Sequence, residues 1–283
     1  MIRKIKEDEV HEVSKFVWQV YQDESKRTTP PYHNLEHVVK TFERTFKADN
    51  YLIGVYDKVM LIGVALICLE EKDRYFSLQG PYILNTDKYN DISNEILTYL
   101  EDKYRGFSCH FGTTKPNVNA QAFLESNGFA CTDDTIQMAV TDESLIEIRC
   151  KSDIQLLDES RMGEYKLFHD RVYHDYYFLA DRIYANFSKW KIHLLLVDNN
   201  IIGSVFTMRQ SEDSGEIYGC HILEPYKSNQ NMSELFYVST KSWMYEGVKK
   251  IVNFVPEGVM SESAGMVGYK AYDTYMCFYK EVL

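Results

Sequence analysis

Residues 216–236 read EIYGCHILEPYKSNQNMSELF, and this stretch decides the fold. We expect a strand over residues 216–223, a turn that contains Pro225, and a helix over 231–246. A strand that leads into the start of a helix presents N–H groups that no helix carbonyl can satisfy. Those groups and the positive end of the helix dipole favour an anionic ligand. The stretch therefore predicts an anion-binding turn in the second half of the chain.

The same pattern occurs earlier in the chain at a fixed offset. Gly63 in YDKVMLIGVALI is followed 140 positions later by Gly203 in VDNNIIGSVFTM. Gly128 closes NVNAQAFLESNGF together with a phenylalanine, and Gly268 closes SESAGMVGYK 140 positions later, together with a tyrosine. Two unrelated landmarks that share one offset indicate an internal duplication. We expect two domains, residues 1–140 and 146–283, joined by the polar segment TDESL.

Each half shows the same order of elements. It consists of a strand, one or two helices, a hairpin, a strand, a helix, a strand, a short helix and a closing strand. In the first half the expected strands are 1–5, 51–56, 59–69, 74–80, 107–112 and 135–140. In the second half they are 146–150 (IEIRC), the hairpin 192–208 with a type I′ turn at Asn199-Asn200, 216–223, 251–255 and 274–282. This order predicts a mixed α+β fold in each half.

Composition limits the class of protein. The chain has 283 residues, of which 45% are hydrophobic and 26% charged, as in soluble globular proteins. No apolar run approaches the roughly 18 residues that span a bilayer. The residues at the N-terminus alternate charged and apolar side chains, so we expect no secretory signal. The six cysteines form no CxxC pair, which is typical of reduced thiols in a cytoplasmic protein. A net charge of −11 argues against a nucleic-acid groove.

The order of elements resembles the GNAT superfamily, the acyl-CoA-dependent N-acyltransferases. Three segments carry the resemblance: NVNAQAFLESNGF with its late helix and Gly-Phe turn, the closing GYKAYDTYMCFYKEV, and EIYGCHILEPYKSNQNMSELF. The resemblance covers nearly the whole chain, twice. It implies two tandem GNAT-like domains, each a mixed, mostly antiparallel sheet flanked by helices. It also implies a parting of the fourth and fifth strands, where acetyl-CoA is held.

The resemblance implies a cofactor site in the second half. The pantetheine arm pairs with free backbone groups of a parted strand, and the pyrophosphate lies at the following helix start. The residues at these positions, with one from the first half, are Ile222, Leu223, Lys227, Ser228, Asn229, Gln230, Asn231, Met232 and Asn117. Gln230 and Met232 stand where the family has glycines, and a left-handed conformation there costs on the order of 1–2 kcal/mol. The first half has Asp87 and Asp91 near the phosphates, so we expect the second half to bind the cofactor.

Acyl transfer needs a base for the amine and a proton for the thiolate. Glu216, at the start of its strand, is the candidate base, and His221, expected on the opposite face of that strand, is its rival. The family's proton-donating tyrosine is replaced by Leu124 in the first half and Ala264 in the second. Tyr272 or Tyr275 is the candidate substitute.

Two further motifs have alternative interpretations. HNLEH at 33–37 matches the H-x-x-E-H pattern of inverted zinc proteases, but it also suits part of an acceptor pocket or a solvated helix start. The stretch FHDRVYHDYYFLADRIY at 168–184 suits an acceptor cleft for a cationic amine or an amphipathic helix with an aromatic core face. We expect no metal.

The sequence favours an N-acetyltransferase that uses acetyl-CoA and a primary amine of a small molecule or peptide. We expect no nucleic-acid or membrane partner, and a monomer or a homodimer. The alternative is an inactive GNAT-fold protein that binds a ligand or a protein, because both halves depart from the family's glycines and tyrosine.

Overall fold

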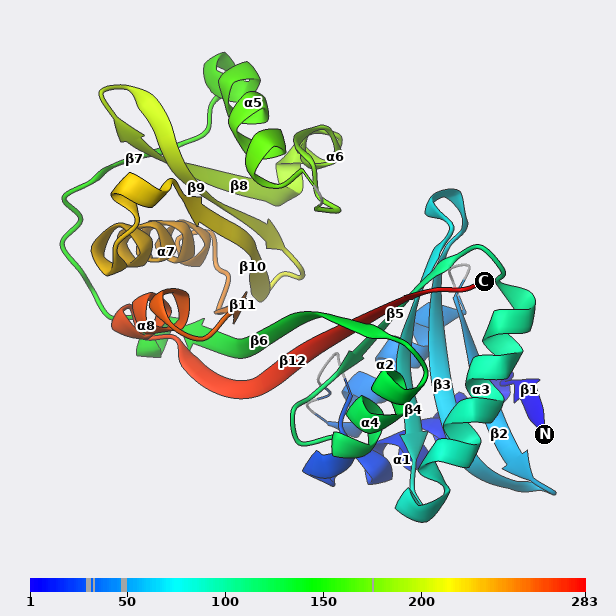
Figure 1. Cartoon of the computed structure of the whole chain (residues 1–283). Helices are drawn as coiled ribbons and strands as arrows, with labels where there is room; N and C mark the ends of the chain where they lie inside the picture. The colour runs from blue at the N-terminus through cyan, green and yellow to red at the C-terminus, as the bar shows by residue number, and fades with distance from the viewer. Residues whose placement is uncertain (29–31, 33, 47–49, 175) are drawn as a thin grey trace. The chain divides into compact units, whose positions relative to one another are not determined.

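The computed structural model describes residues 1–28, 32, 34–46, 50–174 and 176–283 (Figure 1). Contacts divide the chain into two units. Unit 1 comprises Met1–Asp134 and Thr274–Leu283, and unit 2 comprises Thr135–Asp273. Each unit is a mixed sheet with helices on both faces, so the expected α+β class is confirmed.

In unit 1 the strand order is β1-β2-β3-β4-β5-β12. The strands are β1 (Ile2–Lys4), β2 (Tyr51–Asp57), β3 (Met60–Glu70), β4 (Tyr75–Ile83), β5 (Ser108–Thr113) and β12 (Lys270–Glu281). Neighbours are antiparallel except β4 and β5, which are parallel. Helices α1 (Val10–Tyr21) and α2 (Leu35–Thr45) pack on one face of the sheet, and α3 (Tyr89–Lys103) and α4 (Val118–Ser126) pack on the other.

Unit 2 repeats this plan with the strand order β7-β8-β9-β10-β11-β6. The strands are β7 (Asp153–Leu156), β8 (Trp190–Val197), β9 (Asn200–Arg209), β10 (Ser214–Ile222), β11 (Lys250–Val255) and β6 (Ala130–Thr141). The parallel pair here is β10 and β11. Helices α7 (Asn229–Met244) and α8 (Val259–Met266) pack on one face, and α5 (Met162–Val172) and α6 (Ala180–Tyr184) pack on the other.

The last strand of each half of the sequence pairs with a strand from the other half. Met276–Glu281 of β12, late in the sequence, pairs with β5 of unit 1. Ile136–Thr141 of β6, from the first half, pairs with β11 of unit 2. The units therefore differ from the sequence division at 140 and 146, because β6 and β12 each begin in one unit and end in the other.

Two local expectations need correction. The segment 146–150 is not a strand; the first strand of unit 2 is β7, which pairs with β8. Instead Ile146 donates its N–H to the carbonyl of Val267, and this short connector crosses α8 and α7 rather than joining the sheet edge. The β8–β9 turn is one residue earlier than expected: Asp198 and Asn199 have φ of 49° and 63°, the two positive values that a type I′ turn requires.

The pairing of β12 with β5 can be tested by a substitution in β12 that should destabilise unit 1. Phe278 lies on β12 and is fully buried in the core of unit 1. We expect Phe278→Ala to cost about 3–5 kcal/mol of stability. Native-state hydrogen exchange will show faster exchange in β5 and α3, although the substituted residue is in the second half of the sequence.

Protection of β9 in unit 2 should change little in this variant. Tyr245→Ala, at a side chain that is 80% exposed, is the control and should shift stability by no more than about 0.5 kcal/mol. Loss of protection in β9 with β5 unaffected would contradict the strand exchange.

Candidate functional site

The parallel strands of unit 2 part, as expected. β10 and β11 are paired only from Ser214↔Lys250 to Ile217↔Asn253. Beyond this point β10 stays on β9 as far as Ile222, while β11 stays on β6 as far as Val255. Each strand follows a different neighbour, so the two separate after Ile217.

The outer part of β10 turns backbone groups toward the parting. Leu223 donates its N–H to the carbonyl of Ile202 on β9, at 2.8 Å. Alternate residues of an antiparallel strand point their N–H and C=O groups to opposite sides. Cys220 and Ile222 therefore direct these groups away from β9, toward the side that β11 has left. Of the two backbone positions expected to meet a ligand, Ile222 faces the parting and Leu223 is committed to the sheet.

The helix that follows has a serine cap. Ser228 has extended backbone angles, and its hydroxyl accepts the N–H of Asn231 at 3.2 Å. None of residues 227–232 has a positive φ. The expected cost of left-handed residues at Gln230 and Met232 therefore does not arise, because a Ser-capped helix needs no glycine here. The N–H groups of Asn229 and Gln230 remain at the helix start, where no helix carbonyl can accept them.

Most side chains of residues 227–232 form contacts that stabilise this turn and the start of α7. Asn231 donates to the carbonyl of Tyr226 at 2.7 Å, Gln230 donates to Glu234 at 3.0 Å, and Asn229 donates to Glu262 at 3.3 Å. Met232 is buried, with its sulfur 3.2 Å from the thiol of Cys220. Lys227 is exposed, and its ammonium lies 3.2 Å from Glu224. Lys227 is thus an exposed cation beside the helix start, and the others fix the turn.

Glu216 lies on the paired part of β10, just before the parting. Its carboxylate accepts a hydrogen bond from Gln210 at 3.1 Å, and Gln210 also donates to the hydroxyl of Tyr218 at 2.6 Å. Burial raises the pKa of Glu216 to about 7, although the hydrogen bond from Gln210 opposes this shift. A carboxyl group with this pKa exchanges a proton near neutral pH, as a general base requires.

His221 was expected on the opposite face from Glu216, and this is wrong. A β-bulge between Ile217 and Gly219 inserts one residue into β10 and shifts the alternation. The imidazole lies on the α5–α6 face, with its ring centroid 6.4 Å from that of Phe168 and 6.2 Å from that of Tyr173. Burial lowers the pKa of His221. Both candidate bases are therefore on one face.

The two candidate tyrosines belong to different units. Tyr275 lies in unit 1, where burial and the neighbouring Cys277 raise its pKa. Tyr272 lies in unit 2, and its pKa is raised by burial, by Asp273 and by Glu216. Of these two candidates, Tyr272 is thus the one that unit 2 itself places within the electrostatic influence of Glu216; Tyr218, which shares Gln210 with Glu216, is a further tyrosine there. The two positions of the family's proton donor, Leu124 and Ala264, are fully buried.

Unit 1 has the same parting, but its own chain fills it. β4 and β5 are paired from Tyr75 to Leu78 only, and β4 continues to Ile83. Thr28 forms a bridge with Thr113 at the end of β5, and its hydroxyl accepts the N–H of Gly80 on β4 at 3.2 Å.

Asn117 is part of this closure. Its carbonyl oxygen caps α4 by accepting the N–H of Ala120, and its amide donates to the carbonyl of Arg27 at 3.0 Å. The side chain is 1% exposed. Asn117 is therefore not available to a cofactor, and sequence reasoning missed Thr28, which no motif marks.

The two ambiguous motifs have structural roles in the described residues. His33 and Asp175 lie outside them. Asn34 caps α2 by accepting the N–H of His37, and Glu36 is exposed and 2.6 Å from Lys40. Within the described ranges, no three His, Cys, Asp or Glu side chains are grouped for a metal ion.

The aromatic stretch of α5 and the segment after it covers the sheet. Asp170 accepts the N–H of Ala180 at 2.9 Å and the ammonium of Lys166 at 2.8 Å, so it fixes the chain between α5 and α6. Tyr176 donates its hydroxyl to the carbonyl of Tyr218, at the bulge of β10, at 2.8 Å.

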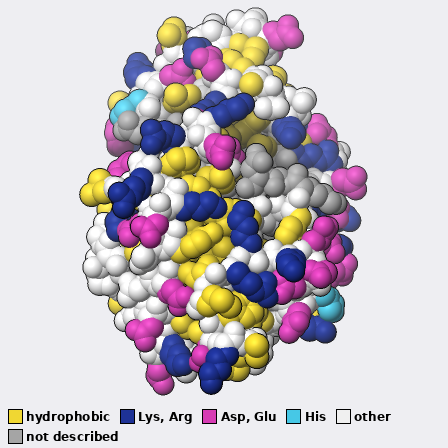
Figure 2. Space-filling model, turned by 90° about the vertical axis from the view of Figure 1, so that its right-hand side faces the viewer, with side chains coloured by type: hydrophobic (Ala, Val, Ile, Leu, Met, Phe, Trp, Pro, Cys, Tyr) yellow, Lys and Arg dark blue, Asp and Glu magenta, His cyan; other side chains and the backbone are white. Residues whose placement is uncertain are grey.

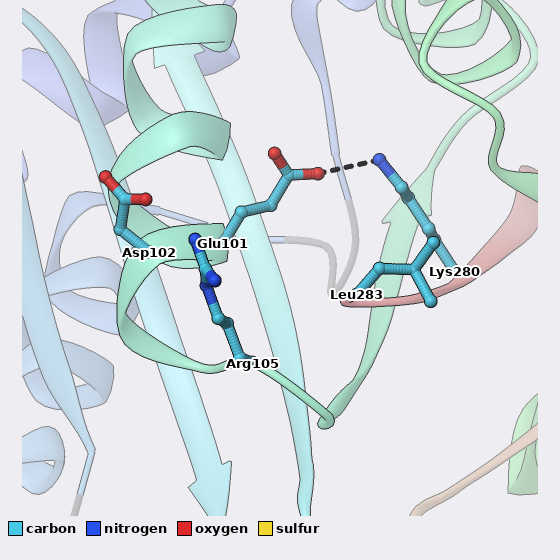
Figure 3. A pocket seen from close by; sticks show the side chains of 5 residues that line it. All are labelled: Glu101, Asp102, Arg105, Lys280 and Leu283. Atoms are coloured by element: carbon cyan, nitrogen blue, oxygen red, sulfur yellow. Dashed lines mark hydrogen bonds and ion pairs between the residues drawn. The ribbon is translucent and has the colours of Figure 1, made fainter.

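A surface hollow in unit 1 lies elsewhere. It is lined by Glu101, Asp102 and Arg105 near the C-terminal end of α3, with Lys280 and Leu283, and a 2.7 Å ion pair joins Glu101 to Lys280 (Figure 3). The strand parting is at the opposite end of α3. On the face shown in Figure 2, basic and acidic side chains are interspersed. None of the helices over the described residues has the length and apolarity to cross a membrane.

Several GNAT proteins are among the solved structures that superpose on this chain. A GCN5-related N-acetyltransferase from Sphaerobacter thermophilus superposes with a TM-score of 0.69 and 13% identity, over 100% of this chain and 95% of its own. A tandem GNAT protein from the clavulanic acid biosynthesis pathway gives 0.60 and 9%, over 100% and 98%. A glucosamine N-acetyltransferase region of a fungal multi-domain β-N-acetylglucosaminidase gives 0.64 and 12%, over 99% of this chain and 38% of that one.

No family model matches the chain, and no curated protein matches it in sequence. The likeness is one of structure at low identity, and it shows that the chain has the GNAT fold in tandem.

The pKa of Glu216 has a consequence for stability. The folded state holds the proton up to about pH 7, whereas the unfolded chain releases it near 4.5. The unfolded state therefore binds fewer protons between these values, and stability falls as pH rises through this window. We expect urea unfolding to show that Glu216→Gln gains stability relative to wild type from pH 4.5 to 7. Gln210→Leu, which removes the opposing hydrogen bond, should extend the loss to higher pH. A pH-independent difference between wild type and Glu216→Gln would contradict the raised pKa.

Proposed function

We propose that the protein is an N-acetyltransferase that moves an acetyl group from acetyl-CoA to a primary amine of a small molecule or peptide, with unit 2 as its catalytic unit. The observation that supports this most is a single strand, β10, that places a carboxyl group of pKa about 7 just before a parting with a capped helix start beyond it. The GNAT fold supports the same reaction class.

The residues of unit 2 fit acetyl-CoA. The backbone groups of Cys220 and Ile222 face the parting and suit the amides of a pantetheine arm. The N–H groups at the start of α7, with the exposed ammonium of Lys227, suit a pyrophosphate. Acetyl-CoA supplies an activated acyl thioester. In unit 1 the corresponding groups are met by Thr28, so we expect one binding site per chain.

Glu216 acts on the acceptor amine. A primary amine is mostly protonated at neutral pH, and only the neutral form is a nucleophile. Glu216, once ionised, accepts the proton of the ammonium, directly or through water. Gln210 holds the carboxylate by a hydrogen bond and leaves its second oxygen for this role.

Over the whole reaction a C–N bond forms, a C–S bond breaks and one proton reaches the departing sulfur. Tyr272 is the candidate donor of this proton in unit 2, because it is protonated at neutral pH and lies within the electrostatic influence of Glu216. Positioning alone supplies much of the acceleration, since a thioester is already activated.

A second candidate is a GNAT-fold protein that binds a ligand without turnover. The observation that favours it is the burial of Leu124 and Ala264 where the family has a tyrosine. Both candidates predict binding of acetyl-CoA, and only the first predicts that an amine releases the free thiol.

Calorimetry of two charge reversals tests the cofactor site. Lys227→Glu should weaken acetyl-CoA binding roughly tenfold or more, because it places a carboxylate beside the pyrophosphate. Lys88→Glu is the control: Lys88 is the N-cap residue of α3 in unit 1, within one position of the equivalent of Lys227 and similarly exposed, and its reversal should leave affinity unchanged. A stoichiometry of two per chain would show that unit 1 binds as well, and a loss with Lys88→Glu alone would place the site in unit 1.

Thiol release from acetyl-CoA with a panel of amines tests the base. We expect kcat/KM to rise with pH through about 7, as Glu216 loses its proton. Glu216→Gln should lower kcat roughly 100- to 10,000-fold and remove this pH dependence while leaving acetyl-CoA affinity unchanged. Tight binding with no amine-dependent thiol release in the wild type would favour the binding protein instead.

A further inference from the structure

Lys250 lies on the same face of the unit 2 sheet as Glu216. It is on the neighbouring strand β11, two residues before Val252, which pairs with Glu216. Lys250 is paired with Ser214, and Val252 with Glu216, in the parallel ladder. Paired residues of neighbouring strands point to the same face, as do residues two apart on one strand. The Cα atoms of Glu216 and Lys250 are therefore diagonal neighbours, roughly 7–8 Å apart.

The ammonium of Lys250 has an aromatic partner and no acidic one. It lies over the ring of Tyr272, 5.0 Å from the centroid. Across the described residues it forms no ion pair, whereas the adjacent Lys249 is 3.0 Å from Asp213. The side chain is half-buried, and burial lowers its pKa. A half-buried cation without a carboxylate partner is suited to an anionic ligand.

We propose that Lys250 binds a carboxylate of the acceptor, so that the acceptors are amines that carry a carboxylate, such as α-amino acids. This inference rests on the proposed function and names the substrate class of the same site. Glu216 is at the end of the ladder nearer the parting, where the thioester is expected, and Lys250 is farther from it. The amine of such an acceptor therefore faces Glu216, and its carboxylate faces Lys250.

The charges of the two side chains, on diagonal neighbours of one face, match this class of molecule. Charge-assisted hydrogen bonds of about 2.8 Å at each end allow a short zwitterion to reach both groups. The ring of Tyr272 lies under the ammonium and near Glu216, so it forms one wall of the site. An amine without a carboxylate leaves the Lys250 ammonium half-buried with no anionic partner, which disfavours its binding.

The experiment compares acceptors that differ only in the carboxylate. Glycine with methylamine, L-phenylalanine with phenethylamine, and L-tyrosine with tyramine are such pairs, and thiol release gives kcat/KM for each. We expect wild type to prefer the carboxylate-bearing member by roughly tenfold to a hundredfold. Lys250→Met should remove this preference, mostly through KM, and Lys250→Arg should keep much of it.

Lys249→Met is the matched control, because Lys249 is 76% exposed and paired with Asp213, and it should preserve the preference. Equal rates for both members of every pair would overturn the inference while the acetyltransferase stands.

A second measurement covers the case without turnover. Calorimetry of the same amino acids in the presence of CoA should show binding that Lys250→Met weakens and Lys249→Met does not. If no amine releases thiol but this binding is present, the proposed reaction fails and the carboxylate site stands. If neither binding nor preference depends on Lys250, the carboxylate site is excluded.

Discussion

In each unit the two parallel strands pair over only four residues, and the structure depends on what the backbone groups beyond that point bond to. Past Ile217 in unit 2 and Leu78 in unit 1, backbone N–H and C=O groups turn toward a strand that has left. Such groups cost free energy unless they find a partner. Unit 1 supplies one from its own chain, with Thr28 against β5 and β4. Unit 2 has no bridge of this kind among the described residues; the carbonyl of Tyr218 accepts the hydroxyl of Tyr176, and the groups of Cys220 and Ile222 remain directed at a place suited to an amide-bearing ligand. The two units thus share one topology, but the gap between the parallel strands is closed by the chain itself in unit 1 and is left for a ligand in unit 2.

A single extra residue in β10 arranges the chemistry around this parting in unit 2. The bulge between Ile217 and Gly219 changes which side chains share a face. Glu216, Tyr218 and His221 all lie toward α5 and α6, while Cys220 and Ile222 pack toward α7. The face toward α7 anchors the helix start through Met232 and Cys220. The other face carries the titratable groups Glu216 and His221, so these side chains and the packing that holds the helix start lie on opposite sides of one sheet.

Much of this could be predicted from the sequence, because helical and strand periods are local. The two repeats, the α+β class, the parting and the position of Glu216 on the strand before it all follow from local pattern and from resemblance. What depends on pairing between distant segments was not predictable. Nothing local tells whether the closing strand after Gly128 or after Gly268 joins its own sheet. A bulge is likewise decided by the neighbouring strand, so the face of His221 was predicted wrongly. Thr28 and Lys250 carry no motif, and only the strand register shows what each meets.

The exchange of β6 and β12 also affects the order in which the chain folds during synthesis. The ribosome finishes β1 to β5 long before it makes Met276–Glu281, which pair with β5. Until then β5 exposes an edge that another nascent chain is able to bind, while the first half waits for the whole of unit 2 to emerge. A chain that ends before Asp273 therefore leaves both units incomplete, and one that ends just after it leaves unit 2 whole and unit 1 without its last strand.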